Sequence, residues 1–508
     1  MSGKEMTATH RAGADATHHV DVAIIGAGPA GSAAARQLAL WGHSVALIGR
    51  PPRRALGESL PPSCTKLFDR LGVREAIDHA QFIRASGNTV QWAGQPVRVE
   101  PFEPSVLGYQ VSRDRFDAVL VSSARDAGAL VIDDATVRDV EREAGVWLVA
   151  YDRASQRETV RAPWLLDCSG RSGVIAKREL RASTASARTT AIVGVWESDR
   201  PWPIDDDTHT LVESYTGGWA WSVPVALGRR YVTVMLDPKV SEVPGRGQLP
   251  TAYRAELART RMVGALVQSA TLVELPWGCD ASPYGATEAA RDGALLVGDA
   301  ASFVDPLSSF GVKKALASAW LASVAVHTCL LDSAMTNVAL DFFSRREREM
   351  YERLQRQSAS LSREAASAYA SDFWRGRVDG AIEESPQELD EASLRSDHWI
   401  LQAFEELKRR SSVRLRGGDS LRVIERPMVR GNRIVLDKHL VARNIPNGVR
   451  YFRNVDLVVI AELASRYDQV PDLFDAYNAF TRAAPPAPLT DFLGALSTLI
   501  GLEVLSLA

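Results

Sequence analysis

Three glycines near the start of the chain have the spacing of a phosphate-binding turn. They lie in Gly26-Ala-Gly28-Pro-Ala-Gly31, after the apolar run Val20–Ile25 and at the head of a helical pattern over residues 29–42. In such a turn the first glycine permits a tight bend, the second lets a pyrophosphate approach, and the third lets helix and strand pack closely. The free N–H groups of the helix start attract phosphate. The motif therefore predicts a dinucleotide site that includes Gly26, Gly28, Ala30 and Gly31.

Two more turns follow apolar strands and could lie beside this site. One is Asp167-Cys-Ser-Gly170, and the other is Gly298-Asp299. At the end of the second strand, residues 45–48, an acidic residue normally binds the ribose hydroxyls. This chain has Gly49 and Arg50 there, so we expect adenosine to be held differently or more weakly, with Arg50 nearby.

Aromatic residues dominate two later motifs. These are Trp219-Ala-Trp221-Ser-Val-Pro224 and Phe303-Val-Asp-Pro306-Leu-Ser-Ser309-Phe310-Gly311. Two Trp residues at positions i and i+2 lie on the same face of a strand. An aromatic-rich core strand with no role in catalysis would show the same pattern. In this order the two motifs resemble the WxWxIP and FxxPxxSxG signatures of flavin-dependent halogenases, within the FAD-dependent monooxygenase superfamily. The resemblance covers roughly residues 20–335 and includes Gly57-Glu58-Ser59, which is similar to the GES loop of phenol-type halogenases.

The resemblance implies FAD as the cofactor and assigns roles to individual residues. Asp299 would bind the ribityl chain, with a helix cap as its alternative, and Arg113 would contact FAD, with a surface ion pair as its alternative. The other implied FAD contacts are Arg50, Glu58, Ser59, Asp167, Gly170, Gly298, Gly311 and Val312. Residues implied in catalysis or in lining a tunnel are Trp219, Trp221, Pro224, Phe303, Pro306, Ser309, Phe310, Gly311 and Lys313. Either Lys313 or Lys314 could approach the flavin pyrimidine, unless both lie on a solvated helix face.

The lysine that halogenases need after the GES loop is missing. The corresponding stretch, Phe82–Trp92, contains Arg84 but no lysine, and Lys66 lies in the helical pattern Pro62–Leu71. Arginine stays protonated and is a poor carrier of halogen. The pattern resembles a side branch of the family whose members hydroxylate a protein-bound tryptophan during maturation of tryptophylquinone enzymes. We therefore expect a monooxygenase that hydroxylates an electron-rich aromatic, free or within a peptide or protein, through a flavin hydroperoxide.

Three alternatives stay open: a halogenase acting on a tryptophan, phenol or pyrrole, a flavin-dependent alkene reductase, and a non-catalytic flavin-binding assembly factor. Molecular oxygen would be the co-substrate of the monooxygenase. No second dinucleotide fingerprint is visible, so electrons would come from a separate flavin reductase.

The predicted fold is of the α/β (α+β) class: a Rossmann-like, GR2-type FAD-binding domain with an inserted antiparallel sheet for the substrate and a helical C-terminal region. Apolar strand patterns alternate with helical ones in the first part, whereas residues 190–237 carry β-rich runs broken by Pro and Gly. The charged run Arg345–Glu349 is interpreted as a solvated helix face. The expected segments are a disordered tail (1–19), the FAD domain (20–185 and 285–335), the substrate sheet (186–284), a helical region (336–410), and a small module with a terminal helix capped by Thr490 (411–508).

Composition excludes several other classes of function. With 59 Lys and Arg against 62 Asp and Glu, the net charge is −3, which favours neither nucleic acid nor an anionic membrane. Four dispersed cysteines predict a reduced, cytoplasmic setting without a disulfide framework or metal site. The sequence contains no run of 18 apolar residues, so we expect no transmembrane helix.

Overall fold

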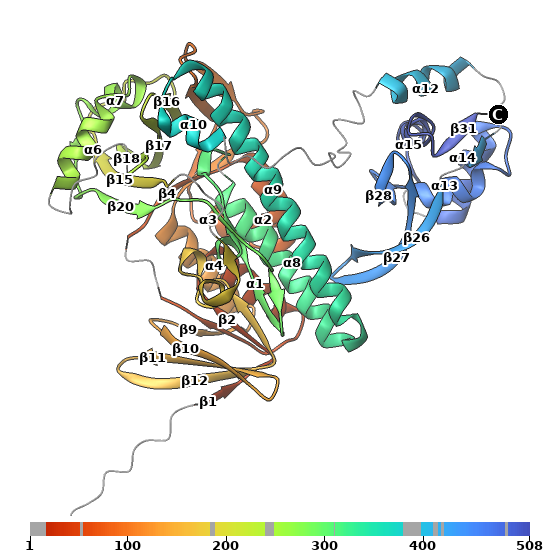
Figure 1. Ribbon diagram of the computed structural model, residues 1–508, viewed down its shortest axis with the longest axis horizontal. Helices are drawn as coiled ribbons and strands as arrows, with labels where there is room; N and C mark the ends of the chain where they lie inside the picture. Colours follow the sequence, from red (N-terminus) through yellow and green to blue (C-terminus); the bar gives the residue numbers. More distant parts are fainter. Residues whose placement is uncertain are drawn as a thin grey trace, which may run out of the picture. The chain divides into compact units, whose positions relative to one another are not determined.

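The computed structural model describes residues 17–50, 54–182, 188–238, 248–308, 310–378, 398–409, 415–417, 421–482 and 486–507. The chain divides into two compact units, Met1–Ile382 and Glu383–Ala508 (Figure 1). The division falls before residue 410, where the sequence analysis ended the helical region. Residues 1–16 of the predicted tail and Ser309 lie outside the described residues.

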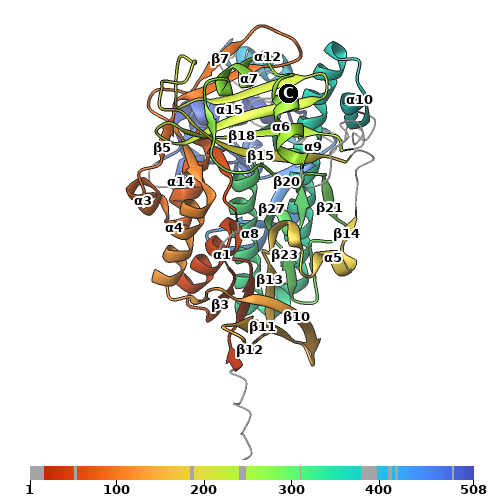
Figure 2. The ribbon, with the colours of Figure 1, turned by 90° about the vertical axis from the view of Figure 1, so that its left-hand side faces the viewer.

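The first unit is built on a six-stranded sheet in the order β22-β23-β13-β2-β3-β9. All neighbours in it are parallel except β22, which is antiparallel to β23. Its central strands are buried on both faces, as their unbroken apolar sequences require. Helices α1 (Pro29–Leu40), α4 (Arg113–Asp126) and α8 (Gly311–Leu331) pack beside it, as Figure 2 shows for α1 and α8. The strands are β2 (Val22–Ile25), β3 (Val45–Ile48), β9 (Leu130–Ile132), β13 (Trp164–Asp167), β22 (Ala290–Arg291) and β23 (Ala294–Leu296).

Helix α8 is long and apolar enough to cross a membrane, and it is the one such helix among the described residues. In this structure 72% of its most apolar window is buried, and it packs on α1 and on α9 (Thr336–Ala368). A core helix of a large domain has this character.

The second large sheet has the order β19-β15-β18-β17-β16-β6-β7, with β20 also paired to β15. Strands β6 and β7 come from residues 87–101, which the sequence analysis placed in the FAD domain. They belong to this sheet because β6 pairs in parallel with β16 and β7 pairs with β6. Helices α6 (Leu249–Leu257) and α7 (Met262–Val267) cover its outer face through an apolar cluster. The strands are β6 (Gly87–Gln91), β7 (Arg98–Pro101), β15 (Thr190–Glu197), β16 (Thr210–Tyr215), β17 (Gly218–Ala226), β18 (Arg229–Leu236), β19 (Thr271–Leu272) and β20 (Trp277–Asp280).

Three smaller sheets complete the first unit. Thr17–His19, predicted as part of a loose tail, instead forms β1 and pairs in parallel with β12. Figures 1 and 2 place the sheet of β10, β11 and β12 at the opposite end of this unit from β15 and β18. The strands are β10 (Thr136–Glu143), β11 (Val146–Arg153) and β12 (Gln156–Ala162); β4 (Gly57–Leu60), β5 (Ile83–Ala85) and β8 (Gly108–Ser112); and β14 (Arg181–Ala182), β21 (Tyr284–Ala286) and β24 (Ser302–Phe303). Short helices are α2 (Thr65–Leu71), α3 (Arg74–His79) and α5 (Ala176–Glu179).

The charged helical region is more buried than its sequence predicts. Helix α9 ends at Ala368, and α10 (Asp372–Val378) turns back so that Phe373 and Trp374 are fully buried. Glu347, within the run interpreted as a solvated face, is only 7% exposed. That interpretation is wrong at Glu347, because α9 packs along α8 and this residue lies on the packed side.

The second unit has a separate apolar core formed by helices and a β-hairpin. Helix α12 (His398–Arg409) packs on the terminal helix α15 (Leu489–Gly501). The residue that caps α15 is Pro488, so Thr490 is not the cap that its sequence predicts. The other elements are β25 (Leu415–Gly417), β26 (Arg422–Arg430), β27 (Arg433–Ala442), β28 (Ile445–Val449), β29 (Tyr451–Phe452), β30 (Val455–Asp456), α13 (Leu457–Ala464), α14 (Val470–Thr481) and β31 (Leu505–Leu507).

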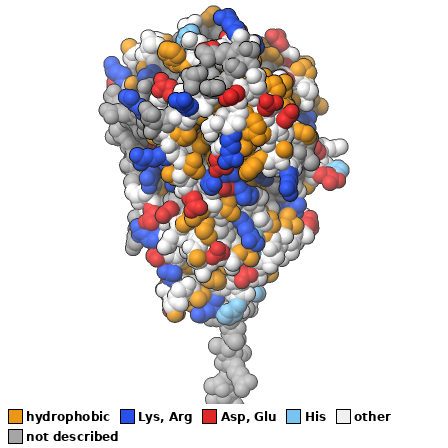
Figure 3. Space-filling model, turned by 90° about the vertical axis from the view of Figure 1, so that its right-hand side faces the viewer, with side chains coloured by type: hydrophobic (Ala, Val, Ile, Leu, Met, Phe, Trp, Pro, Cys, Tyr) orange, Lys and Arg blue, Asp and Glu red, His pale blue; other side chains and the backbone are white. Residues whose placement is uncertain are grey.

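Basic and acidic side chains are interspersed on the face shown in Figure 3, with hydrophobic side chains scattered among them. This mixture accords with the net charge of −3 and gives that face no broad area of one sign.

Candidate functional site

A cavity of about 620 Å³ lies in the first unit, between the carboxyl ends of the parallel strands and the eight-stranded sheet. In open parallel sheets, ligands bind outside these strand ends. Most of the residues singled out from the sequence line this one cavity. They are Gly26, Gly28, Ala30, Arg50, Glu58, Ser59, Arg113, Gly170, Trp219, Trp221, Asp299, Phe303, Pro306, Gly311 and Val312.

Each of the three glycines in the first motif occupies its position for a different structural reason. A side chain at Gly26, where φ is +105°, would overlap the Cys168 carbonyl, and one at Gly31 would overlap the Gly26 carbonyl. Gly28 is different: a Cβ there would face the cavity, with Arg113 Nη2 as its nearest neighbour at 3.8 Å. Gly28 also caps α1, whose first turn carries no acidic residue. The turn therefore leaves room and free N–H groups for a pyrophosphate.

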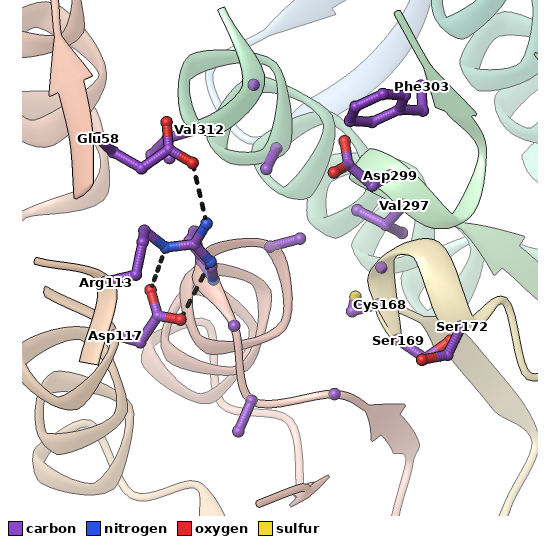
Figure 4. Close-up of a pocket in the computed structure, with 18 of the residues that line it drawn as sticks. Glu58, Arg113, Asp117, Cys168, Ser169, Ser172, Val297, Asp299, Phe303 and Val312 are labelled. Carbon is purple, nitrogen blue, oxygen red and sulfur yellow. Dashed lines mark hydrogen bonds and ion pairs between the residues drawn. The ribbon is translucent and has the colours of Figure 1, made fainter. Parts of the chain in front are cut away.

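Arg113 lies between two carboxylates at one side of the cavity (Figure 4). Its guanidinium contacts Asp117 at 2.9 and 3.0 Å and Glu58 Oε1 at 3.4 Å. Burial lowers the pKa of Arg113, but the charges of Asp117 and Glu58 outweigh burial and raise it overall. Burial raises the pKa of Glu58 and of Asp117, against the opposing effect of Arg113. Asp117, one turn after Arg113, was missed in the sequence, although the i,i+4 spacing could have indicated the pair.

The end of β3 has an unusual composition for a nucleotide site. A Cβ at Gly49 would lie 2.6 Å from Ala27 Cβ, so this position requires glycine. Arg50 lines the cavity next to it, together with Thr136 and Val137 from the start of β10, which the sequence did not single out. Within the described lining, no acidic residue follows β3, so the groups available for an adenosine are neutral ones and Arg50.

Asp299 faces the cavity from a short helical turn, Gly298–Ala300, opposite Arg113 (Figure 4). Its Oδ1 pairs with Lys314 Nζ at 3.1 Å. The adjacent Lys313 points elsewhere and donates to Ser63 Oγ at 2.8 Å, outside the cavity lining. Of the two lysines left open by the sequence, the structure brings Lys314 to Asp299.

Three other predicted cofactor residues support the cavity from behind. The buried Asp167 carboxylate accepts hydrogen bonds from Ser169 and from the N–H groups of Ile175 and Ala176, which fixes the loop carrying Gly170. Gly298 and Gly31 likewise lie outside the lining.

The other end of the cavity is aromatic. The rings of Trp219 and Trp221 stack with centroids 4.6 Å apart and an interplanar angle of 24°. Phe303 lies nearby, with the Arg171 guanidinium 4.0 Å from its ring. Smaller side chains complete this end: Thr210, Val212, Val223, Pro306 and Leu307.

Two predicted residues of this end lie outside it. Pro224 is buried in β17 beyond the lining, paired with Arg230. Phe310 caps α8, where the Lys313 ammonium lies 4.8 Å from its ring.

Helix α10 closes the aromatic end from behind, which the sequence did not reveal. Trp374 packs edge-on against Trp92 at 5.5 Å and donates from Nε1 to the Tyr215 carbonyl at 2.9 Å. Arg377 Nε lies 3.8 Å from Asp305 Oδ2, and burial raises the pKa of Asp305 to about 6 despite this charge.

Within the described cavity lining there is no lysine. Arg84, at the position of the missing halogenase lysine, is exposed, pairs with Asp78 at 3.2 Å and covers the Tyr109 ring at 4.1 Å. Lys66 is exposed on α2.

Comparisons with known proteins agree with this geometry. A family model described as FAD binding domain matches residues 19–356. The chain is 28% identical over 337 residues to a tryptophan 2-halogenase of Chondromyces crocatus, covering 64% of each protein. It is 28% identical over 336 residues to the flavin-dependent halogenase armH1 of Armillaria mellea, covering 58% of this chain and 62% of that protein. The chain therefore spans a little under two thirds of the length of these relatives.

Solved structures share the fold over nearly the whole chain. The flavin-dependent halogenase CmlS superposes with a TM-score of 0.75 at 24% identity, covering 96% of both chains. The peptidyl tryptophan dihydroxylase QhpG superposes with a TM-score of 0.69 at 24% identity, covering 91% of this chain and 97% of that one.

The residues present fit FAD. The open face of Gly28 and the start of α1, where no side chain bonds the free N–H groups, suit a pyrophosphate, and the cavity continues from there past Asp299 to an aromatic wall. With more than half of its length matched by the model for this domain, the chain belongs to the FAD binding domain family, and FAD is its cofactor.

Proposed function

We propose that the protein is an FAD-dependent monooxygenase of the halogenase-like branch that hydroxylates an electron-rich aromatic. The observation that carries the proposal is the composition of the aromatic end. Trp219, Trp221 and Phe303 line it, and the described lining contains no lysine that could receive a halogen. An aromatic ring can stack on such a wall, whereas a charged substrate would lose its hydration there without a partner.

Each part of the chain has a distinct task in this proposal. Bound reduced FAD would supply the activation of molecular oxygen. The stacked Trp219 and Trp221 would hold the substrate ring and keep water out of the site. Helix α10 would support this wall, because Trp374 and Phe373 fill the space behind Trp219. Reduced flavin would come from a separate reductase, which the absence of a second dinucleotide fingerprint in the sequence favours.

Halogenation is the second candidate, and the halogenase relatives favour it. The test is to supply FADH2, oxygen and bromide with a panel of phenols, indoles and pyrroles, and to identify products by mass spectrometry. We expect products that have gained oxygen and no bromine. A brominated product would contradict the proposal, and its loss in Lys66→Ala or Lys313→Ala would identify the lysine responsible.

We further propose that the aromatic can be a tryptophan side chain in a peptide or protein. The structural likeness to a peptidyl tryptophan dihydroxylase supports this choice of substrate class. The full chain should be given a tryptophan-containing peptide, free tryptophan and a simple phenol at equal concentration. Oxygenation of the peptide well above the free molecules is the expected result, and equal or faster turnover of the phenol would favour a small-molecule hydroxylase.

A further inference from the structure

Lys314 is a buried cation directly behind the cofactor cavity. Its side chain is 3% exposed, and Nζ pairs with Asp299 Oδ1 at 3.1 Å. The ammonium also donates to the Ser302 carbonyl, and the Ser302 hydroxyl and the Gly298 carbonyl lie at 3.4 and 3.5 Å. A buried ammonium needs a counter-charge and hydrogen-bond acceptors, and the Gly298–Ser302 loop provides both.

Asp299 has two sides with different surroundings. One side receives Lys314, and the other faces the cavity, where the Asp299 side chain is still 30% exposed. Figure 4 shows Asp299 at the cavity edge, across from Arg113. An exposed carboxylate normally samples several rotamers, and ordering it on ligand binding costs free energy. The contact with Lys314 fixes the carboxylate before any ligand arrives.

A second buried group extends this arrangement to α9. Glu347 lies behind α8, where Ser318 and Lys314 are its polar neighbours. Ser318 in turn accepts a hydrogen bond from the Gly298 N–H at 2.9 Å. Burial raises the pKa of Glu347 to about 7, against the opposing effects of Ser318 and Lys314. One oxygen of this carboxyl, Oε2, has no hydrogen-bond partner, so the carboxyl is only partly satisfied where it lies.

We propose that Lys314 is a positioning residue of the FAD site, which acts by fixing the Asp299 carboxylate, and that Glu347 modulates it from behind. When Glu347 is neutral, Asp299 is the one carboxylate within the described part of the chain that forms an ion pair with Lys314. When Glu347 ionises, its charge attracts the same ammonium and adds negative charge behind a site that binds an anionic cofactor. FAD affinity should therefore fall as the pH rises through neutrality.

The test measures FAD affinity of the apoprotein by quenching of flavin fluorescence, so it does not depend on which aromatic reaction the protein performs. Lys314→Gln keeps a donor for the Ser302 carbonyl but removes the charge, and should weaken FAD binding about tenfold, or about 1.4 kcal/mol. Lys314→Arg should restore most of the loss. Lys66→Met, at an exposed lysine outside the lining, should bind FAD as the unaltered chain does.

A double-mutant cycle distinguishes positioning from a general structural effect. If Lys314 acts through Asp299, then Lys314→Gln should cost little further affinity in an Asp299→Asn background. Fully additive losses, or a larger loss in Lys313→Met than in Lys314→Gln, would overturn the proposal. Glu347→Gln is the second arm: it should flatten the dependence of FAD affinity on pH between 6 and 8, and an unchanged pH profile would remove Glu347 from the proposal.

Discussion

The two ends of the cavity are made in different ways. The nucleotide end is built largely from backbone: the Gly26–Gly31 turn, the start of α1 and the ends of parallel strands, with the side chains of Arg113 and Asp299 on opposite sides. The aromatic end is built from side chains that come from β16, β17, the segment 303–307 and the supporting helix α10. One end therefore depends on local conformation, and the other depends on long-range packing.

This difference determines how each end should tolerate change. Backbone features bind any dinucleotide of the right shape, so they constrain the cofactor and leave the reaction open. Packed side chains set the shape and polarity of the substrate space, and a single truncation there opens a void. Four substitutions test the contrast.

Removal of Trp374 should have the largest effect. Trp374→Ala leaves a void behind Trp219 and an unpaired Tyr215 carbonyl, so the free energy of unfolding should fall by about 4 kcal/mol. Urea unfolding measures the loss, and FAD affinity of the folded fraction should change by less than about twofold. Trp399→Ala is the control, because Trp399 is 65% exposed in the second unit. Equal losses in both variants would contradict the assignment of α10 as a support for the aromatic end.

A neutral replacement of Glu347 should stabilise the protein in a pH-dependent way. Burial raises the pKa of Glu347 from 4.5 to about 7. As the pH rises through this range, Glu347 therefore lowers the free energy of unfolding by an increasing amount. Glu347→Gln removes the penalty, and the gain in unfolding free energy should be about 2 to 3 kcal/mol larger at pH 8 than at pH 5. Thermal or urea unfolding at both values checks it. A gain that is larger at pH 5 would show that the carboxyl is ionised throughout.

Crowding the glycine turn should affect only the nucleotide end. Gly28→Ala places a methyl group toward the cavity, close to Arg113 and away from other atoms, so the fold should keep its stability. FAD affinity should drop about tenfold, because the pyrophosphate loses its close approach. Flavin fluorescence titration measures this change, with melting temperature as the internal control. Unaltered affinity would mean that the phosphates lie elsewhere.

Opening the aromatic wall should change coupling more than binding. Trp221→Ala lets water into the substrate space, so hydrogen peroxide formed per FADH2 oxidised should rise about threefold, which corresponds to about 0.7 kcal/mol. FAD affinity should change less than twofold. Trp221→Phe keeps a ring and should recover most of the coupling. Peroxide yield at the level of the unaltered chain would exclude a water-excluding role for this ring.

Much of the lining of the nucleotide end could be predicted from sequence, although Asp117, Thr136 and Val137 were missed. Glycine spacing, strand patterns and the Gly298-Asp299 turn are local signals, and they identified residues that line one cavity. At the aromatic end the two motifs were visible, but their surroundings were not. Trp374 lies far along the chain in a region read as charged and helical, and no local pattern links it to Trp92 or Trp219.

Burial on the long helices was the weakest part of the sequence interpretation. Lys313 and Lys314 are adjacent, and the sequence left both open. Helical spacing could have separated them, because Lys314 shares a face with Ser318 and Ala322, small residues typical of close packing. Glu347 offered a weaker signal: it lies among four other charged residues, but it stands four positions from both Phe343 and Tyr351, which are buried on the same face of α9.

The parallel pairing of β6 with β16, and the late closure by α10, have a consequence for biosynthesis. Trp92 leaves the ribosome long before Trp219, and both precede Trp374. Until α10 is synthesised, the growing chain exposes the apolar surface that later becomes the back wall of the site. Exposed surfaces of this kind recruit chaperones or aggregate. A translation product that stops before Asp372 should therefore accumulate as an insoluble species, even though every strand of the FAD-binding sheet has been made.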